Sequence, residues 1–223
     1  MDRPSTYWSA KAQEKLNESR YWKSARLQQR TQWTGLTTLV NEADVVYASA
    51  QYLISPIESI LNIEYGDRIR ISSEKPGKSG KIGEGHIRMD LVFHRPEKEQ
   101  TIAILEYKRR GFLQRRDFQG AFTSSNVGLG EKLSRAANDP LLKDNAFVSS
   151  KQAAAYAIDT QTPFVAIFDW DTMVLFEFNN LKDDNVGEVA FGTWVDENGR
   201  ETFRKVLLGW VLKACQARDV PRQ

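Results

Sequence analysis

The sequence predicts an α/β domain, and three observations favour this fold class. Residues 102–105 form an unbroken apolar run, as in a strand that is covered on both faces. Residues 86–93 alternate between polar and apolar side chains, which is typical of a half-buried strand. Residues 201–217 place apolar side chains at helical spacing, so an amphipathic helix is expected to pack on the sheet.

The first forty residues are expected to form a helical extension, and residues 41–223 the main domain. Residues 6–32 mix basic and aromatic side chains, a composition that suits either contact with a phosphate backbone or packing on the domain; packing is the favoured interpretation. A helix should begin at Asn41 and stop at Pro56. A second helix should begin there, with Ser55 as N-cap and Glu58 three residues later.

The remaining elements follow from the same signals. We expect strands over residues 68–72, 86–93 and 101–108, a short helix over 117–122, and a loop over 124–130. A helix should begin at Ser149 and end before Pro163. Residues 164–178 read as a hairpin that turns at 169–172, where Asp169 and Asp171 are ordinary turn residues. An edge strand is expected over 188–195.

Charged side chains gather where two of these strands end. Asp90 lies on the alternating strand, and Glu106 and Lys108 project to one side of the buried one. Carboxylates are suitable ligands for Mg²⁺ or Mn²⁺, and an adjacent ammonium would position water and offset charge on a phosphate. The pattern therefore indicates a hydrolytic metal site.

An Asp followed by a hydrophobic strand ending in Glu106-x-Lys108 resembles the PD-(D/E)XK nucleases. Downstream, Gln152-x-x-x-Tyr156 is similar to the motif of the RecB and lambda-exonuclease branch. The resemblance covers residues 55–178. It implies a restriction-endonuclease-like mixed central sheet with helical additions at both ends, and metal-dependent phosphodiester hydrolysis. It further implies that Gln152 orients Lys108 or the substrate.

In these nucleases a glutamate on the helix before the sheet often adds a metal ligand. Glu58 is the nearest candidate, although it is equally the glutamate of a capping box. Glu42 and Glu64 are weaker candidates. The expected metal ligands are thus Asp90, Glu106 and Glu58.

The formal net charge is only +2, so attraction to nucleic acid must come from local clusters. The expected substrate-binding residues are Tyr156 and the cations nearby: Lys151, Arg109, Arg110, Arg115 and Arg116. One cysteine excludes an intrachain disulfide, and two histidines argue against a His-rich zinc site. No signal-peptide pattern and no apolar run of membrane-spanning length is present, so we expect an intracellular protein that does not bind a membrane.

The sequence therefore predicts a Mg²⁺- or Mn²⁺-dependent nuclease, with DNA favoured over RNA as substrate. A nuclease-like module that has lost catalysis and binds nucleic acid or a protein is the alternative. An unrelated α/β interaction domain is a third possibility.

Overall fold

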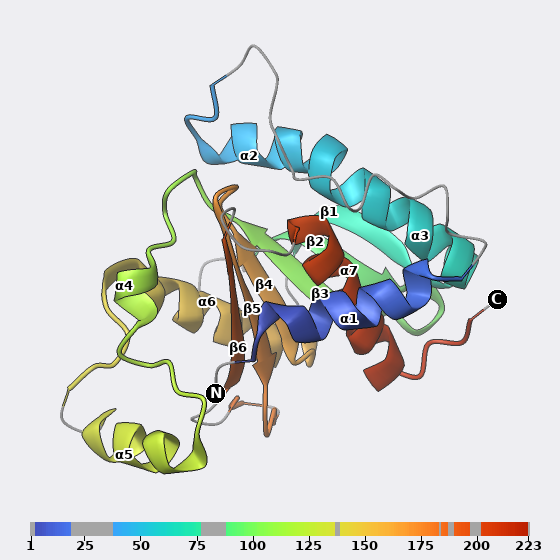
Figure 1. The fold of residues 1–223 in the computed structure, drawn as a ribbon. Helices are drawn as coiled ribbons and strands as arrows, with labels where there is room; N and C mark the ends of the chain where they lie inside the picture. Colours follow the sequence, from blue (N-terminus) through green and yellow to red (C-terminus); the bar gives the residue numbers. More distant parts are fainter. Residues whose placement is uncertain are drawn as a thin grey trace.

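The computed structural model describes residues 3–18, 38–76, 88–136, 139–182, 184–186, 190–196 and 202–222. About half of the basic and aromatic segment over residues 6–32 lies outside these ranges, as do the first two residues of the strand expected over 86–93. Within them the chain forms a mixed six-stranded sheet with helices on both faces, so the α/β class is confirmed (Figure 1).

The sheet has strand order β1-β2-β3-β4-β5-β6. Only β3 and β4 are parallel, and the other neighbours are antiparallel. A long connection carrying α4, α5 and α6 therefore joins β3 to β4. The strands are β1 Arg70–Pro76, β2 Arg88–Arg95, β3 Gln100–Tyr107, β4 Phe164–Phe168, β5 Thr172–Phe178 and β6 Ala190–Asp196.

Two apolar clusters cover the two faces of the sheet. One joins the sheet to the helices of both ends of the chain, including Trp8 and Trp210, while the other joins it to α4 and α6. The α-helices are α1 Ser5–Leu16, α2 Glu42–Ser49, α3 Ser55–Tyr65, α4 Arg115–Phe118, α5 Asn126–Ala136, α6 Asp144–Thr160 and α7 Phe203–Ala217. Three short helical turns complete the described part: η2 Ala50–Ile54, η3 Gly66–Arg68 and η4 Pro96–Lys98.

A new α-helix begins at Ser55 with Pro56 in its first turn, as predicted, but the predicted interruption of the helical chain before it is wrong. Asn41 is the N-cap of α2 and forms a capping box, so the helix starts where expected, but the π-helical turn η2 then connects α2 directly to α3. This wider turn places Pro56 at the start of α3, where its missing N–H is tolerated. Ser55 consequently makes no N-cap hydrogen bond, and Glu58 is not part of a capping box.

The loop predicted over residues 124–130 is also wrong, because most of it belongs to α5. Gly128 and Gly130 each lower helix propensity by about 1 kcal/mol, which favoured the loop interpretation. Leu129 and Leu133, one helical turn apart, are both partly buried in α5 and offset that cost. In a smaller difference, α6 begins at Asp144 rather than at Ser149.

Candidate active site

Asp90 and Glu106 lie on neighbouring antiparallel strands near the end of β3. Leu91 pairs with Leu105, and this register places Asp90 opposite Glu106. The backbone N–H of Tyr107 donates to Asp90 Oδ2 over 2.8 Å, which ties the aspartate to β3 directly. The two acids that the sequence motif singled out are therefore brought together.

Helix α6 supplies the next part of the site. Gln152 Nε2 donates to Glu106 Oε1 over 2.6 Å and to the Tyr156 hydroxyl over 2.5 Å. The Tyr156 hydroxyl donates in turn to the Arg88 carbonyl over 2.9 Å. Because Gln152 and Tyr156 are four residues apart on one helical face, α6 presents both to β2 and β3 together.

Lys108 completes the cluster. Its ammonium lies 2.7 Å from Glu106 Oε1, and both side chains are largely buried, at 13% and 5% exposed. This pair is thus shielded from water and screened less than a surface ion pair. Two donors, from Lys108 and Gln152, converge on one oxygen of Glu106.

The other oxygen of Glu106 has a different environment. Glu106 Oε2 is buried and has no hydrogen-bond partner within the described residues. Burial and then the neighbouring Asp90 raise the pKa of Glu106 to about 7, against the opposing effects of Lys108 and of the nearby Tyr156 hydroxyl. A buried acceptor without a donor, beside a second carboxylate, would be satisfied by a cation.

A group of three or more Asp, Glu, His or Cys side chains arranged to hold a metal is not found in the described ranges. Asp90 and Glu106 nevertheless fit a hard divalent cation. Mg²⁺ is typically held by one or two protein carboxylates and keeps several water molecules. Glu106 Oε2, the buried oxygen to which no described residue donates, is the oxygen that such an ion would contact.

Glu42, rather than Glu58, is the glutamate with a link to this cluster. Glu42 begins α2, and its pKa is raised by burial and by Asp90 and opposed by Lys108, so both groups lie within electrostatic range. Glu42 and Glu58 are both exposed, so it is this electrostatic link, and not burial of the residue, that distinguishes Glu42 from Glu58 on α3. The sequence contained no clear signal for Glu42, because its approach to Asp90 depends on how the helix pair α2–α3 packs over the sheet.

The turn between β4 and β5 holds the segment that follows Lys108. The Lys108 N–H donates to the Phe168 carbonyl over 2.9 Å, and the Leu113 N–H donates to Asp169 Oδ2 over 2.7 Å. Asp169 Oδ1 accepts from Thr172 N–H over 2.8 Å, which is the turn role predicted for it. This turn therefore anchors the chain on both sides of the basic residues 109 and 110.

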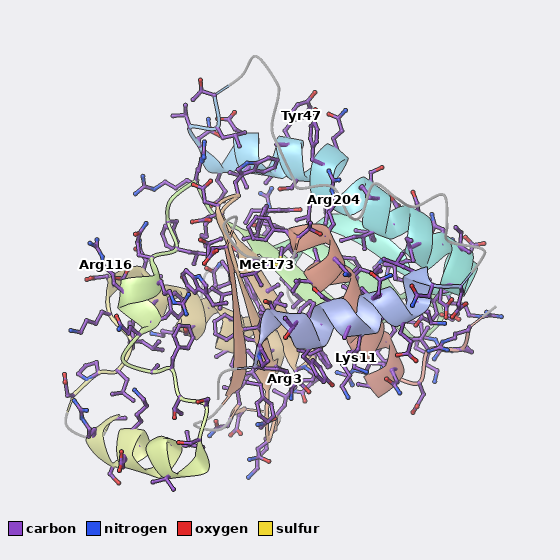
Figure 2. The ribbon with its side chains drawn as sticks, in the orientation of Figure 1. Arg3, Lys11, Tyr47, Arg116, Met173 and Arg204 are labelled. Carbon is purple, nitrogen blue, oxygen red and sulfur yellow. The ribbon has the colours of Figure 1, made fainter. Side chains whose placement is uncertain are left out.

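The predicted substrate-binding cations differ in their environments. Arg109 and Lys151 are exposed, whereas Arg110 makes a bidentate contact with Asp171 at 2.9 Å to each oxygen. On α4, the Arg115 side chain is 66% exposed and lies 3.9 Å from an Asp196 oxygen. The Arg116 side chain is 83% exposed and points outward from α4 (Figure 2).

No helix among the described residues has the length and apolarity of a membrane span. No family model and no curated protein matches the sequence. A chain in a DrdV–DNA complex determined by cryoEM is similar in fold at 13% sequence identity, with a TM-score of 0.36. That alignment covers 94% of this chain and 13% of the other, so this chain spans only a small part of that protein's length.

Proposed function

We propose that the protein is a Mg²⁺- or Mn²⁺-dependent nuclease whose active site is formed by Asp90, Glu106 and Lys108. The observation that supports this most strongly is the arrangement around Glu106. One of its oxygens takes donors from Lys108 and Gln152, while the other is buried beside Asp90 and has no partner in the described part of the chain. DNA is the expected substrate, from the resemblance to the PD-(D/E)XK nucleases.

Each residue has a role that its contacts suggest. Asp90 and Glu106 would hold the cation, and Asp90 is fixed for this by the Tyr107 N–H. A bound cation of this kind polarises a phosphoryl oxygen and lowers the pKa of a coordinated water. Lys108, largely shielded from solvent, would orient the attacking water and offset the negative charge that grows on the phosphate.

Gln152 would act by positioning Glu106. Its amide holds Glu106 Oε1 and is itself held next to the Tyr156 hydroxyl, so the carboxylate keeps one orientation. Tyr156 then links this network to β2 through the Arg88 carbonyl. Glu42 and Glu58 remain the two candidates for a third acid, and the electrostatic link of Glu42 to Asp90 and Lys108 favours Glu42.

Cleavage assays test this function directly. Single-stranded DNA, double-stranded DNA and RNA are each incubated with wild-type protein in Mg²⁺, in Mn²⁺ and in EDTA, beside Lys108→Ala and Asp90→Asn. We expect metal-dependent cleavage that falls at least about a hundredfold in Lys108→Ala, the loss typical when one preorganised stabilising donor is removed. Glu58→Gln is the matched control, an exposed glutamate whose loss should leave the rate unchanged if Glu42 is the third acid.

The same assays distinguish the alternatives. A wild-type protein that binds nucleic acid but cuts none of the three substrates would replace this proposal with the non-catalytic binding module. Equal cleavage by wild type and Lys108→Ala would show that the activity does not arise at this site.

A further inference from the structure

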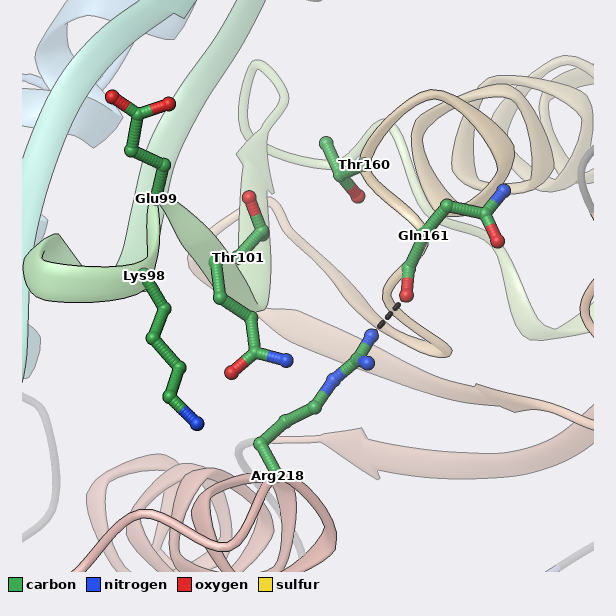
Figure 3. Close-up of a pocket in the computed structure, with 7 residues that line it drawn as sticks. Lys98, Glu99, Thr101, Thr160, Gln161 and Arg218 are labelled. Atoms are coloured by element: carbon green, nitrogen blue, oxygen red, sulfur yellow. Dashed lines mark hydrogen bonds between the residues drawn. The ribbon is translucent and has the colours of Figure 1, made fainter.

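A pocket lined by polar and charged residues lies beside the start of β3 (Figure 3), whereas the candidate active site lies near the end of that strand. It has a volume of about 310 Å³ and is lined by the start of β3, the end of α6 and Arg218, which follows α7. Strands rise about 3.3 Å per residue, so the six steps along β3 from Gln100 to Glu106 separate the two places by roughly 20 Å. The pocket is therefore a distinct feature from the proposed nuclease site.

Arg218 is the first sign that this pocket suits an anion. Burial lowers the pKa of its half-buried guanidinium. Its guanidinium donates to the Gln161 carbonyl, and it forms no salt bridge to a carboxylate of the described residues. A guanidinium has five N–H donors, so most of them remain available to a ligand. A partly buried cation without a counter-charge is costly, and an anion would relieve that cost.

Lys98 supports the same interpretation, and Gln100 adds a hydrogen-bond acceptor for another part of a ligand. Lys98 and Glu99 both line the pocket; the Lys98 side chain extends toward Arg218, while the carboxylate of Glu99 points away from both (Figure 3). Gln100 also lines the pocket, and its Oε1 is buried with no hydrogen-bond partner within the described residues. The pocket thus combines two cations that face one another with one acceptor for which the described residues supply no donor.

We propose that this pocket binds a phosphate group. The planar guanidinium of Arg218 can donate two parallel N–H hydrogen bonds to two phosphate oxygens, and Lys98 adds a second positive charge. A hydroxyl or amino group on the same ligand would donate to Gln100 Oε1. The phosphate is carried either by a small phosphorylated molecule or by a nucleic-acid backbone, and both present the same chemistry to these residues.

Binding measurements on the full chain test the proposal. Isothermal titration with orthophosphate, a nucleoside 5′-monophosphate and a short oligonucleotide is performed in EDTA, with chloride maintaining constant ionic strength. An Asp90→Asn, Lys108→Ala background excludes binding at the candidate active site. We expect Lys98→Gln to weaken phosphate binding about tenfold, as for one lost charge-assisted hydrogen bond.

Two other variants complete the test. Arg218→Lys keeps the charge but removes the planar guanidinium, so it should also weaken binding, whereas Arg135→Gln removes an exposed cation on α5 and should change nothing. If the mononucleotide binds more tightly than the oligonucleotide and Lys98→Gln removes that difference, the ligand is a small phosphorylated molecule. If the oligonucleotide binds more tightly and Lys98→Gln removes that difference, the ligand is a nucleic-acid backbone. Unchanged affinity in both Lys98→Gln and Arg218→Lys, or no binding of any of the three anions to the wild type, overturns the proposal.

Discussion

Glu106 has the most unusual environment of the site residues, because two donors and one acid neighbour act on it in opposite directions. Its pKa is raised by burial and by Asp90, to about 7 from an ordinary value of 4.5. In the folded protein the carboxyl group therefore retains its proton more tightly than in the unfolded chain. The stabilisation from protonated Glu106 is complete below about pH 4.5 and is lost as pH rises through about 7.

We therefore predict that Glu106→Gln flattens the pH dependence of stability. A shift of this size corresponds to a change on the order of 3 kcal/mol in the free energy of unfolding across that pH window. Urea denaturation at pH 4.5 and 7.5 in EDTA measures it for wild type and variant. Glu58→Gln, at an exposed position on α3, should retain the wild-type slope. An identical slope in wild type and Glu106→Gln would contradict the raised pKa.

A second prediction at this scale decides between the two candidates for the third acid. Glu42 interacts electrostatically with both Lys108 and Asp90. Glu42→Gln should therefore lower the affinity for Mn²⁺, because a negative charge near the ion is lost. Mn²⁺ titrations followed by the rise in Tm compare it with Glu58→Gln, which should behave as wild type. If Glu58→Gln instead lowers the affinity for Mn²⁺ more than Glu42→Gln does, Glu58 is restored as the metal ligand.

At the scale of elements, the packing of α1 on α7 depends on one close approach. A Cβ at Gly209 would lie 1.9 Å from the Trp8 carbonyl oxygen, so a side chain there must move the two helices apart. We predict that Gly209→Ala lowers the free energy of unfolding by about 2 to 3 kcal/mol, as overpacking does. Chemical denaturation measures this loss.

Gly130 on α5 is the matched control for that substitution. A Cβ there meets nothing within 4 Å, so Gly130→Ala should raise stability by about 0.5 to 1 kcal/mol through helix propensity alone. Destabilisation of similar size by both substitutions would show that the close contact with Trp8 does not set the cost.

The elements also show what could be predicted from the sequence. The strand β3 was predicted because its central residues are all apolar, and α7 because its buried residues recur at helical spacing. The continuous α2–α3 arrangement was missed because a π-helical turn has no distinct sequence signal, and Pro56 usually ends a helix. The same turn governs where Glu42 lies, so the motif could supply Asp90, Glu106 and Gln152 but not their neighbour on α2.

At the scale of the whole molecule, the cations differ in how closely they are paired with acids, although the net charge is only +2. Arg110 is held in a bidentate contact with Asp171, and Lys15 and Arg222 both meet the buried Glu64. Arg115 and Arg116 differ from these, since both are well exposed and their acid neighbours lie 3.6 to 3.9 Å away. Contact with a phosphate backbone is therefore expected from α4 more than from the paired cations.

The last prediction follows from that difference. If Arg115 and Arg116 each neutralise one phosphate of duplex DNA, replacing both with Ala should reduce the slope of log K against log salt by about two. Binding should weaken equally for unrelated sequences, because phosphate contacts carry no base information. Fluorescence anisotropy with two unrelated duplexes between 50 and 200 mM salt measures both effects, with Arg135→Ala as the control. The response of Tm to Mn²⁺ should remain as in the wild type, because the two arginines are not part of the acid cluster around Glu106. A slope that is unchanged in the double variant would place the phosphate contacts on another surface of the chain.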